Sequence, residues 1–405
     1  MSEPVRRGEA AVSGLIAAAA ARAQGPAAGL RQPPKNAIVF GGGLPDPTLR
    51  PRAALLELSQ SILGGADSTP LNYAYEAGVV GLREAIAQRH RLVDGVELDP
   101  DQVIVTNGAS GAFALVAATL IDPGDIVLCE ALTYPGALNA FRLGGARVVP
   151  IAMDDGGIDV EALEGRLRQP DIDAGRVKFL YTITTCHSPT GTTLSEGRRQ
   201  RLAELAEEFD LLLVQDNTYG EIRFSPAPPS LLAYAPTRTI HIGSFSKTVA
   251  PGLRVGWMAA PSSIAEVVRR VRTDLGTSPL PQQVLAAFMA DGRYAPHVAH
   301  VSGKYEAKRD VLLRELEANC SPWCRWSTPD GGFVAWVTLN DLAVSAVAEI
   351  AHHEGVAFLP GSYFSADGAD VRGLRLAYGE LPKADLVEGV RRLAVALERA
   401  SKAAR

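Results

Sequence analysis

A segment in the middle of the chain combines an amine with groups that bind phosphate. Ser244, Ser246 and Lys247 lie within four residues of one another, and Arg254 follows seven residues after the lysine. Two hydroxyl groups and a guanidinium group are suitable donors to a phosphate dianion, and a lysine becomes a nucleophile where its surroundings favour the neutral amine. A lone Ser-x-Lys would usually be a solvated turn. The whole string indicates a lysine held beside a phosphate.

An acidic and an aromatic residue follow the apolar run at residues 211–214. These are Asp216 and Tyr219. In parallel α/β sheets, ligands bind outside the carboxyl ends of the strands. There an aspartate can hold a protonated pyridine nitrogen and so keep the ring an electron sink, while the tyrosine can bond a ring oxygen. Taken alone, an aspartate at a strand end is more often a helix cap or a turn residue.

Small residues connect the expected strand at 103–106 to the expected helix at 112–121. They are Gly108, Ala109 and Ser110, and they allow a phosphate to approach the free N–H groups of a helix N-terminus. An ordinary capped turn is the alternative. Tyr134 could stack on a flat ring, or else serve as a core aromatic residue.

Arg375 lies inside the apolar strand Leu374-Arg375-Leu376. A buried guanidinium group without a partner is unfavourable, so the sequence implies a carboxylate near Arg375. That carboxylate can belong to the protein or to a ligand, and the pattern leaves both open.

In this order and spacing, these segments resemble the class I/II aminotransferases of pyridoxal-phosphate (PLP) fold type I, closest in character to the 2-aminoadipate aminotransferase group. The resemblance extends from about Ile38 to Leu393, and the string around Lys247 is its most specific part. It implies a PLP-dependent enzyme that transfers the amino group of an α-amino acid to a 2-oxo acid. No helix-turn-helix segment precedes it, which favours the free-standing enzyme over the fused transcription regulators of this kind.

The resemblance also implies a role for each motif residue. Lys247 would hold the cofactor as a Schiff base and move the proton at the substrate Cα. Asp216 would pair with the pyridine nitrogen and Tyr219 with the ring hydroxyl, while Tyr134 and Thr218 would flank the ring. The residues that would cradle the phosphate are Gly108, Ala109, Ser110, Ser244, Ser246 and Arg254.

Two further roles follow from the same resemblance. Tyr73 would reach the phosphate of a neighbouring subunit, which implies a homodimer with shared active sites. Arg375 would bind the substrate α-carboxylate, with the backbone of Gly42 and Gly43 close by.

One position departs from the family pattern. Ser188 stands in Ser-Pro-Thr-Gly where the family usually has Asn-Pro-Thr-Gly. That asparagine normally bonds the ring oxygen and touches the substrate carboxylate, and serine is shorter with only one donor. We therefore expect Ser188 to border both cofactor and substrate, and we keep a lyase, cyclase, β/γ-replacement enzyme or oxidase of specialised metabolism as alternatives to the aminotransferase. A non-catalytic sensor is disfavoured because Lys247, Asp216, Tyr219 and Arg375 are all present.

The elements that must position these residues alternate along the chain. Apolar strands and helices between about residues 103 and 259 predict a mostly parallel sheet between helices, and the resemblance implies seven strands and an aspartate-aminotransferase-like fold. Near residue 300 the pattern changes to that of a smaller α+β unit. We expect an N-terminal helix and arm at 1–50, a large PLP-binding domain at 51–298 and a small C-terminal domain at 299–405.

Composition excludes several other classes of protein. The 405 residues are 47% hydrophobic and carry a net charge of -5 without a dense Lys/Arg run, so no nucleic-acid surface is expected. Cys320 and Cys324 lack partners at zinc-site spacing, so we predict no metal and a reducing cytoplasm. The alanine-rich run after Arg6 and Arg7 predicts a helix over about residues 9–24 rather than a signal peptide, and no apolar stretch approaches the ~20 residues that span a membrane.

Overall fold

The structure is a computed structural model of the chain, and it describes residues 17–22, 32–73, 76–170, 172 and 174–404. The helix expected at about 9–24 lies mostly outside these residues. Its described part, Ala18–Arg22, forms the 3-10 helix η1.

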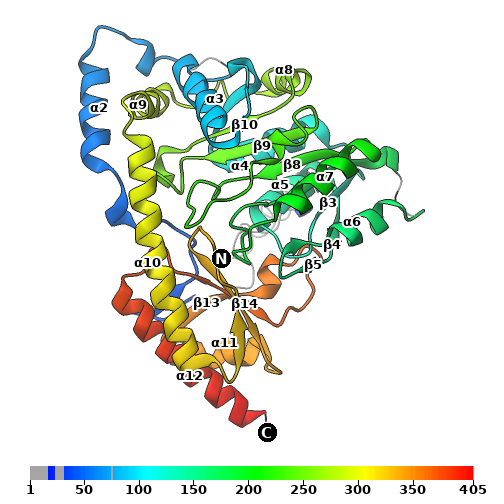
Figure 1. Cartoon of the computed structure of the whole chain (residues 1–405), viewed down its shortest axis with the longest axis vertical. Helices are drawn as coiled ribbons and strands as arrows, with labels where there is room; N and C mark the ends of the chain where they lie inside the picture. The colour runs from blue at the N-terminus through cyan, green and yellow to red at the C-terminus, as the bar shows by residue number, and fades with distance from the viewer. Residues whose placement is uncertain (1–16, 23–31, 74–75, 171, 173, 405) are drawn as a thin grey trace, which may run out of the picture.

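A seven-stranded sheet forms the centre of the larger part of the molecule (Figure 1). Its strand order is β2-β10-β9-β8-β7-β3-β4. Strand β10 runs antiparallel to both of its neighbours, and the other pairs are parallel. The strands are β2 (Val103–Asn107), β3 (Ile126–Glu130), β4 (Arg147–Ile151), β7 (Val177–Thr182), β8 (Leu212–Asp216), β9 (Thr239–Ser244) and β10 (Val255–Ala259). The predicted mostly parallel sheet is confirmed.

Helices cover both faces of this sheet, which explains why its strands are apolar throughout. Alternate residues of one strand enter different cores: Tyr181 of β7 packs in one cluster and its neighbour Leu180 in another. One face carries α4 (Gly108–Leu120), α5 (Pro135–Gly144) and α8 (Ser262–Val271). The other carries α2 (Arg52–Gly64), α3 (Val80–Asp94), α6 (Val160–Leu167), α7 (Glu196–Glu208) and α9 (Pro279–Ala290).

A second sheet of five strands lies below the first in Figure 1, in the order β1-β13-β14-β12-β11. Its first strand comes from the N-terminal arm and pairs in parallel with β13. The strands are β1 (Ile38–Phe40), β11 (Cys324–Trp326), β12 (Val334–Leu339), β13 (Val356–Pro360) and β14 (Gly373–Ala377), and the accompanying helices are α10 (Tyr294–Cys320), α11 (Val344–His353) and α12 (Lys383–Ala403). The expected boundary at 298/299 lies inside α10, which runs beside both parts of the molecule.

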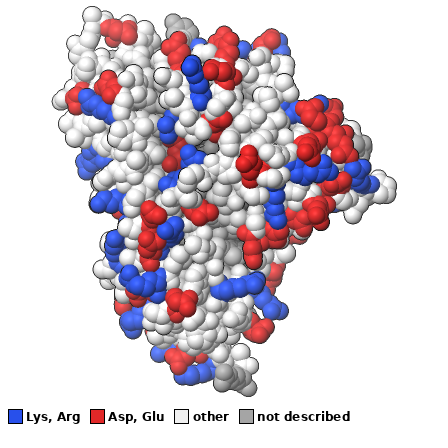
Figure 2. All heavy atoms as spheres, in the orientation of Figure 1, with Lys and Arg blue, Asp and Glu red and all other residues white. Residues whose placement is uncertain are grey.

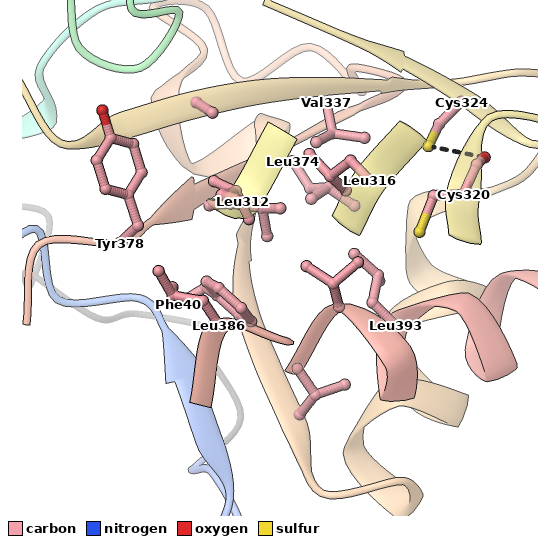
Figure 3. Packing of buried hydrophobic residues seen from close by; sticks show 14 of the residues in the cluster. Phe40, Leu312, Leu316, Cys320, Cys324, Val337, Leu374, Tyr378, Leu386 and Leu393 are labelled. Carbon is pink, nitrogen blue, oxygen red and sulfur yellow. Dashed lines mark hydrogen bonds between the residues drawn. The ribbon is translucent and has the colours of Figure 1, made fainter. Parts of the chain in front are cut away.

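The core of this second unit is apolar and includes Cys320 and Cys324 (Figure 3). Cys320 and Cys324 are buried and free, and the Cys324 thiol donates to the Cys320 carbonyl oxygen. Among the described residues, no group of three or more His, Cys, Asp or Glu side chains could hold a metal ion.

The remaining elements are short. A two-stranded ribbon is formed by β5 (Met153–Asp154) and β6 (Gly157–Ile158). Within the described ranges, no helix has the length and apolar character needed to cross a membrane. On the face displayed in Figure 2, basic and acidic side chains are interspersed.

Candidate active site

The strand ends of the large sheet bring the predicted residues to one edge. Strand β8 ends at Asp216 and strand β9 ends at Ser244, and the parallel arrangement places both ends together. Because β10 runs in the opposite direction, Arg254, which directly precedes it, reaches the same edge. This arrangement follows the rule that ligands bind at the carboxyl ends of parallel strands.

A cavity of about 290 Å³ lies at this edge, and Arg375 of the second sheet contributes to its lining. That volume approaches the lower end of the roughly 300–1,000 Å³ typical of small-molecule sites. The predicted residues that line it are Gly42, Gly43, Ala109, Ser110, Tyr134, Ser188, Asp216, Thr218, Tyr219, Ser244, Ser246, Lys247, Arg254 and Arg375. Residues far apart in the sequence therefore meet in one place.

One corner of the cavity is suited to a phosphate group. The Ser244 hydroxyl donates to the Ser246 hydroxyl oxygen at 2.9 Å, and an Arg254 N–H donates to the Asn107 carbonyl oxygen at 3.1 Å. Helix α4 begins at Gly108 without a side-chain cap, so its first N–H groups and its dipole favour an anion. A Cβ at Gly108 would lie 2.8 Å from Arg254 Nη2, and Gly108 has φ +66°, so only glycine suits this position.

Asp216 is buried, and three donors of the chain orient its carboxyl group. Oδ1 accepts hydrogen bonds from the backbone N–H and the hydroxyl of Thr218, and Oδ2 accepts one from the hydroxyl of Tyr181. Burial raises the pKa of Asp216, and the hydrogen bonds and the charge of Lys247 act against this rise. A buried carboxylate in this condition is stabilised by a cationic partner.

Lys247 extends into the cavity beside an aromatic wall. Its Nζ donates to the carbonyl oxygen of Gly43 at 3.0 Å and lies 5.2 Å from the ring centroid of Tyr219. The Tyr219 ring in turn packs edge-on against Phe333. The amine is therefore held between the edge of the large sheet and the segment that follows β1.

Arg375 reaches the cavity from β14 of the second sheet. Its side chain is 6% exposed, and its guanidinium group donates to the Gly41 carbonyl oxygen at 2.5 Å and the Ser188 hydroxyl oxygen at 3.4 Å. Within the described part of the chain it has no ion-pair partner, and its Nε is buried without an acceptor. Burial lowers the pKa of Arg375. Of the two alternatives left open by the sequence, the structure therefore favours a carboxylate from a ligand.

Two predicted residues do not line this cavity. Gly108 lies behind it, against Arg254. Tyr73 follows the short helix η3 (Thr69–Leu71), and its side chain is 83% exposed. The structure of one chain thus leaves the role of Tyr73 a prediction.

Several residues of the site are not among those predicted from the sequence. Leu44, Phe113 and Ile183 add apolar lining, and Tyr181 contacts Asp216. Tyr181 pairs with Val214 on the neighbouring strand, and Val214 faces the same side of the sheet as Asp216. The alternation of β7 and β8 was therefore the signal that could have identified it.

Known proteins resemble this chain in sequence and in fold. Aromatic-amino-acid aminotransferase 1 of Thermococcus litoralis is 33% identical over 372 residues, or 91% of this chain and 89% of that protein. The solved multiple substrate aminotransferase of Thermococcus profundus has a TM-score of 0.91 at 29% identity and covers 97% of this chain and 99% of its own.

A third similar protein was solved with a ligand. It is the alpha-aminoadipate aminotransferase of Thermus thermophilus, complexed with N-(5'-phosphopyridoxyl)-L-leucine, with a TM-score of 0.86, 33% identity and coverage of 96% of this chain and 99% of its own. The family model described as aminotransferase class I and II matches residues 44–393. As the motifs predicted, the chain belongs to the class I and II aminotransferase family.

Proposed function

We propose that this PLP-dependent aminotransferase binds the α-carboxylate of its amino-acid substrate through Arg375 and carries its cofactor on Lys247. The observation that carries this proposal is the buried Arg375 guanidinium group, which has no ion-pair partner in the described chain and lines the same cavity as Lys247. A buried cation of this kind needs an anion. The carboxylate common to amino acids and 2-oxo acids supplies one.

The cofactor is pyridoxal 5′-phosphate, which supplies an electron sink for the bonds at the substrate Cα. The residues of the cavity fit its groups. The uncapped turn of α4 with Ser244, Ser246 and Arg254 would hold the phosphate, and Asp216 would hold the pyridine N–H. Tyr219 would bond the ring hydroxyl, with Tyr134 and Thr218 beside the ring and Ser188 near its oxygen.

Lys247 is the group of this chain that would move the proton at the substrate Cα. Its Nζ is held by the Gly43 carbonyl oxygen on the side of the cavity that Arg375 also borders. Binding the carboxylate at Arg375 would therefore orient Cα toward Lys247. Leu44, Phe113 and Ile183 would exclude water from the reacting atoms.

We further infer a homodimer with shared active sites, in which Tyr73 of one subunit reaches the phosphate of the other. The exposed side chains of Leu71 and Tyr73, side by side on one segment, support such an interface.

The four buried, unpaired cysteines fit a reducing cytoplasm, and amino-acid biosynthesis is the process we propose. We also propose the domain division at residues 50 and 298, with β1 packed on the small domain.

Arg375→Lys tests the proposed function directly. Lysine retains the charge but loses the two-pronged geometry, so we expect kcat/KM for amino acids to fall by roughly a hundredfold, as when hydrogen bonds to a charged group worth about 1.5–3 kcal/mol each are lost. PLP content should stay unchanged. The matched control is the corresponding amine without a carboxylate, whose slow turnover should be equal in both enzymes.

Labelling supplies the second part of the test. Borohydride reduction followed by peptide mapping should place the pyridoxyl group on Lys247, and Lys247→Ala should lose turnover by several orders of magnitude. A label on another lysine, or an equal loss of amine and amino-acid turnover in Arg375→Lys, would refute the assignment.

A further inference from the structure

The glycine loop, residues 41–44, connects the two cationic groups of the cavity. The carbonyl oxygen of Gly43 accepts from Lys247, and that of Gly41 accepts from Arg375. A Cβ at Gly43 would lie 3.4 Å from Arg375 Nη2, and Gly43 has φ +55°. The position of this loop therefore decides where both side chains point. The loop has no regular secondary structure of its own, so its position depends on what holds its two ends.

The first end of the loop is held by apolar packing. Phe40, the last residue of β1, is fully buried in the core of the second unit (Figure 3). Helix α12 leaves space for its ring at Gly389, where a Cβ would lie 2.5 Å from the Phe40 ring. This end is thus fixed to α12 and to the small sheet.

The second end is held by polar contacts to α10. Asp46 donates its backbone N–H to the Tyr305 hydroxyl oxygen at 2.9 Å, and its Oδ2 accepts from Lys308 Nζ at 2.6 Å. The Lys308 and Asp46 side chains are only 7% and 13% exposed. Although burial acts to raise it, the pKa of Asp46 is lowered by the hydrogen bonds from Lys308 and Thr48.

Lys308 makes a second contact that involves the strand of Arg375. Its Nζ also donates to the carbonyl oxygen of Gly379 at 2.6 Å. Gly379 follows β14, four residues after Arg375, and a Cβ there would lie 2.6 Å from the Leu44 carbonyl oxygen. One buried ammonium group therefore joins the end of the glycine loop to the segment that presents Arg375.

We propose that Lys308 is a positioning residue for substrate binding, because its ammonium group fixes the glycine loop relative to β14 and so holds Arg375 in the orientation that receives a carboxylate. This inference rests on the proposed role of Arg375. Lys308 lies outside the cavity lining and acts only through the loop and β14. Its loss should therefore weaken substrate binding more than it slows the proton transfer at Lys247.

The test compares Lys308→Met with Lys304→Met in the PLP-loaded enzyme. Lys304 lies one turn earlier on α10 and is exposed, so it is a matched control for the helix and the substitution. We expect KM for the amino acid to rise about tenfold in Lys308→Met with little change in kcat, since the loss of binding that is equal in the ground state and the transition state raises KM alone. Hydrogen exchange of peptides covering residues 41–46 should accelerate about tenfold or more, because the loop loses an anchor.

A second variant keeps the test valid if Lys308→Met fails to fold. The double variant Asp46→Asn with Lys308→Met leaves no unpaired buried charge and retains the oxygen that caps Thr48. It should show the same rise in KM and the same faster exchange. PLP affinity and the absorption spectrum should match those of Lys304→Met.

Two results separate this inference from the proposed function. If Arg375→Lys lowers kcat/KM for amino acids but both Lys308 variants match the control in KM and in loop exchange, only the positioning role is wrong. If Arg375→Lys leaves kcat/KM for amino acids unchanged relative to the amine, the proposed carboxylate site is wrong and so is the role of Lys308. A drop in thermal stability alone, without changes in KM or exchange, also overturns the positioning role.

Discussion

The hydroxyl group of Tyr181 donates a hydrogen bond to Oδ2 of Asp216 at 2.9 Å, from one parallel strand to the next. Both residues are buried. Oδ1 receives its hydrogen bonds from Thr218, so Tyr181 is the donor that fixes the other oxygen. The direction and the proton affinity of the Asp216 carboxyl group therefore depend on a residue behind the cavity.

Tyr181→Phe should shift the acid limb of the pH–rate profile. The pKa of Asp216 is already raised by burial, and Tyr181 is one of the groups that counteract the rise. Losing it should raise this pKa further, so the carboxylate that we propose pairs with the pyridine N–H should be lost at a higher pH. A hydrogen bond to a charged group, worth about 1.5–3 kcal/mol, corresponds to a shift of about one to two pH units.

Tyr378→Phe is the matched control for this experiment. Tyr378 is equally buried but bonds the Gly332 carbonyl oxygen, in the core of the second unit. It should lose stability without moving the acid limb. Identical pH profiles for Tyr181→Phe and Tyr378→Phe would show that Tyr181 only fills space.

Glu130 should make stability depend on pH near neutrality. Burial raises the pKa of Glu130 to about 7, against hydrogen bonds from Thr182 and the Ile183 N–H. The folded protein therefore keeps a proton that the unfolded chain releases near 4.5. The stability that this proton contributes is fully present below about pH 4.5 and is lost as the pH rises through about 7.

Glu130→Gln should remove this dependence. Its amide group is neutral at every pH and can accept the same two hydrogen bonds. Between pH 5 and 8, the free energy of unfolding of the parent should fall more than that of the variant by on the order of 2–3 kcal/mol. Denaturant titrations at both pH values measure the difference, and parallel curves would contradict it.

Most of the large sheet was predictable because its strands carry an unambiguous pattern. The strand expected at residues 103–106 is β2 (Val103–Asn107), and most of the apolar run at residues 211–214 lies in β8 (Leu212–Asp216). The cavity residues followed from motifs in which neighbours in the sequence stay neighbours in space, such as Ser244, Ser246 and Lys247. Sequence motifs were therefore sufficient to predict the cavity residues wherever one loop supplies several of them.

Other features depend on contacts between distant segments. Helix α9 contains Pro279 and Pro281, which indicate a turn in the sequence but occupy its first turn in the structure. Strand β13 is a short apolar run that forms a strand by pairing with β1, which lies more than 300 residues earlier in the chain. The sequence pattern around Lys308 predicts a solvent-exposed lysine on a charged helix. Only the fold brings Asp46 and Gly379 into contact with it.

Shared active sites predict complementation between two inactive variants. Mixing refolded Tyr73→Ala and Lys247→Ala chains should restore activity, because one site of each mixed dimer combines an intact Tyr73 with an intact Lys247. Random pairing should give roughly a quarter of the parent activity, since half of the dimers are mixed and one of their two sites is complete.

The control for complementation mixes Lys247→Ala with the double variant Tyr73→Ala, Lys247→Ala. This mixture contains no intact lysine and should stay inactive. Full activity of a monomer in sedimentation at micromolar concentration would contradict the shared site.

The last prediction concerns Ser188, which should shape the reaction rather than merely replace a longer residue. Its hydroxyl oxygen lies 3.4 Å from Arg375 Nη1, and its side chain lines the same cavity as Tyr219. An asparagine here would add a donor near the ring oxygen and would crowd the carboxylate site at Arg375. With the cofactor bound as proposed, serine would leave Tyr219 as the main donor to the ring oxygen and would leave space for a water molecule or a bulkier substrate.

Ser188→Asn should therefore change both spectrum and turnover. An added hydrogen bond worth about 0.5–1.5 kcal/mol should move the pH midpoint of the cofactor's absorption change downward by up to about one unit. Turnover of the native substrate should fall by roughly three- to tenfold, because an energy of the same size added to the activation barrier slows the reaction by that factor. Alternatively, the products should shift toward simple transamination. Ser188→Ala separates the contributions, because it opens the same space without adding a donor and should leave the midpoint near that of the parent. If Ser188→Asn keeps the parent's rates, products and midpoint, Ser188 is a neutral replacement and Arg375 alone defines the carboxylate site.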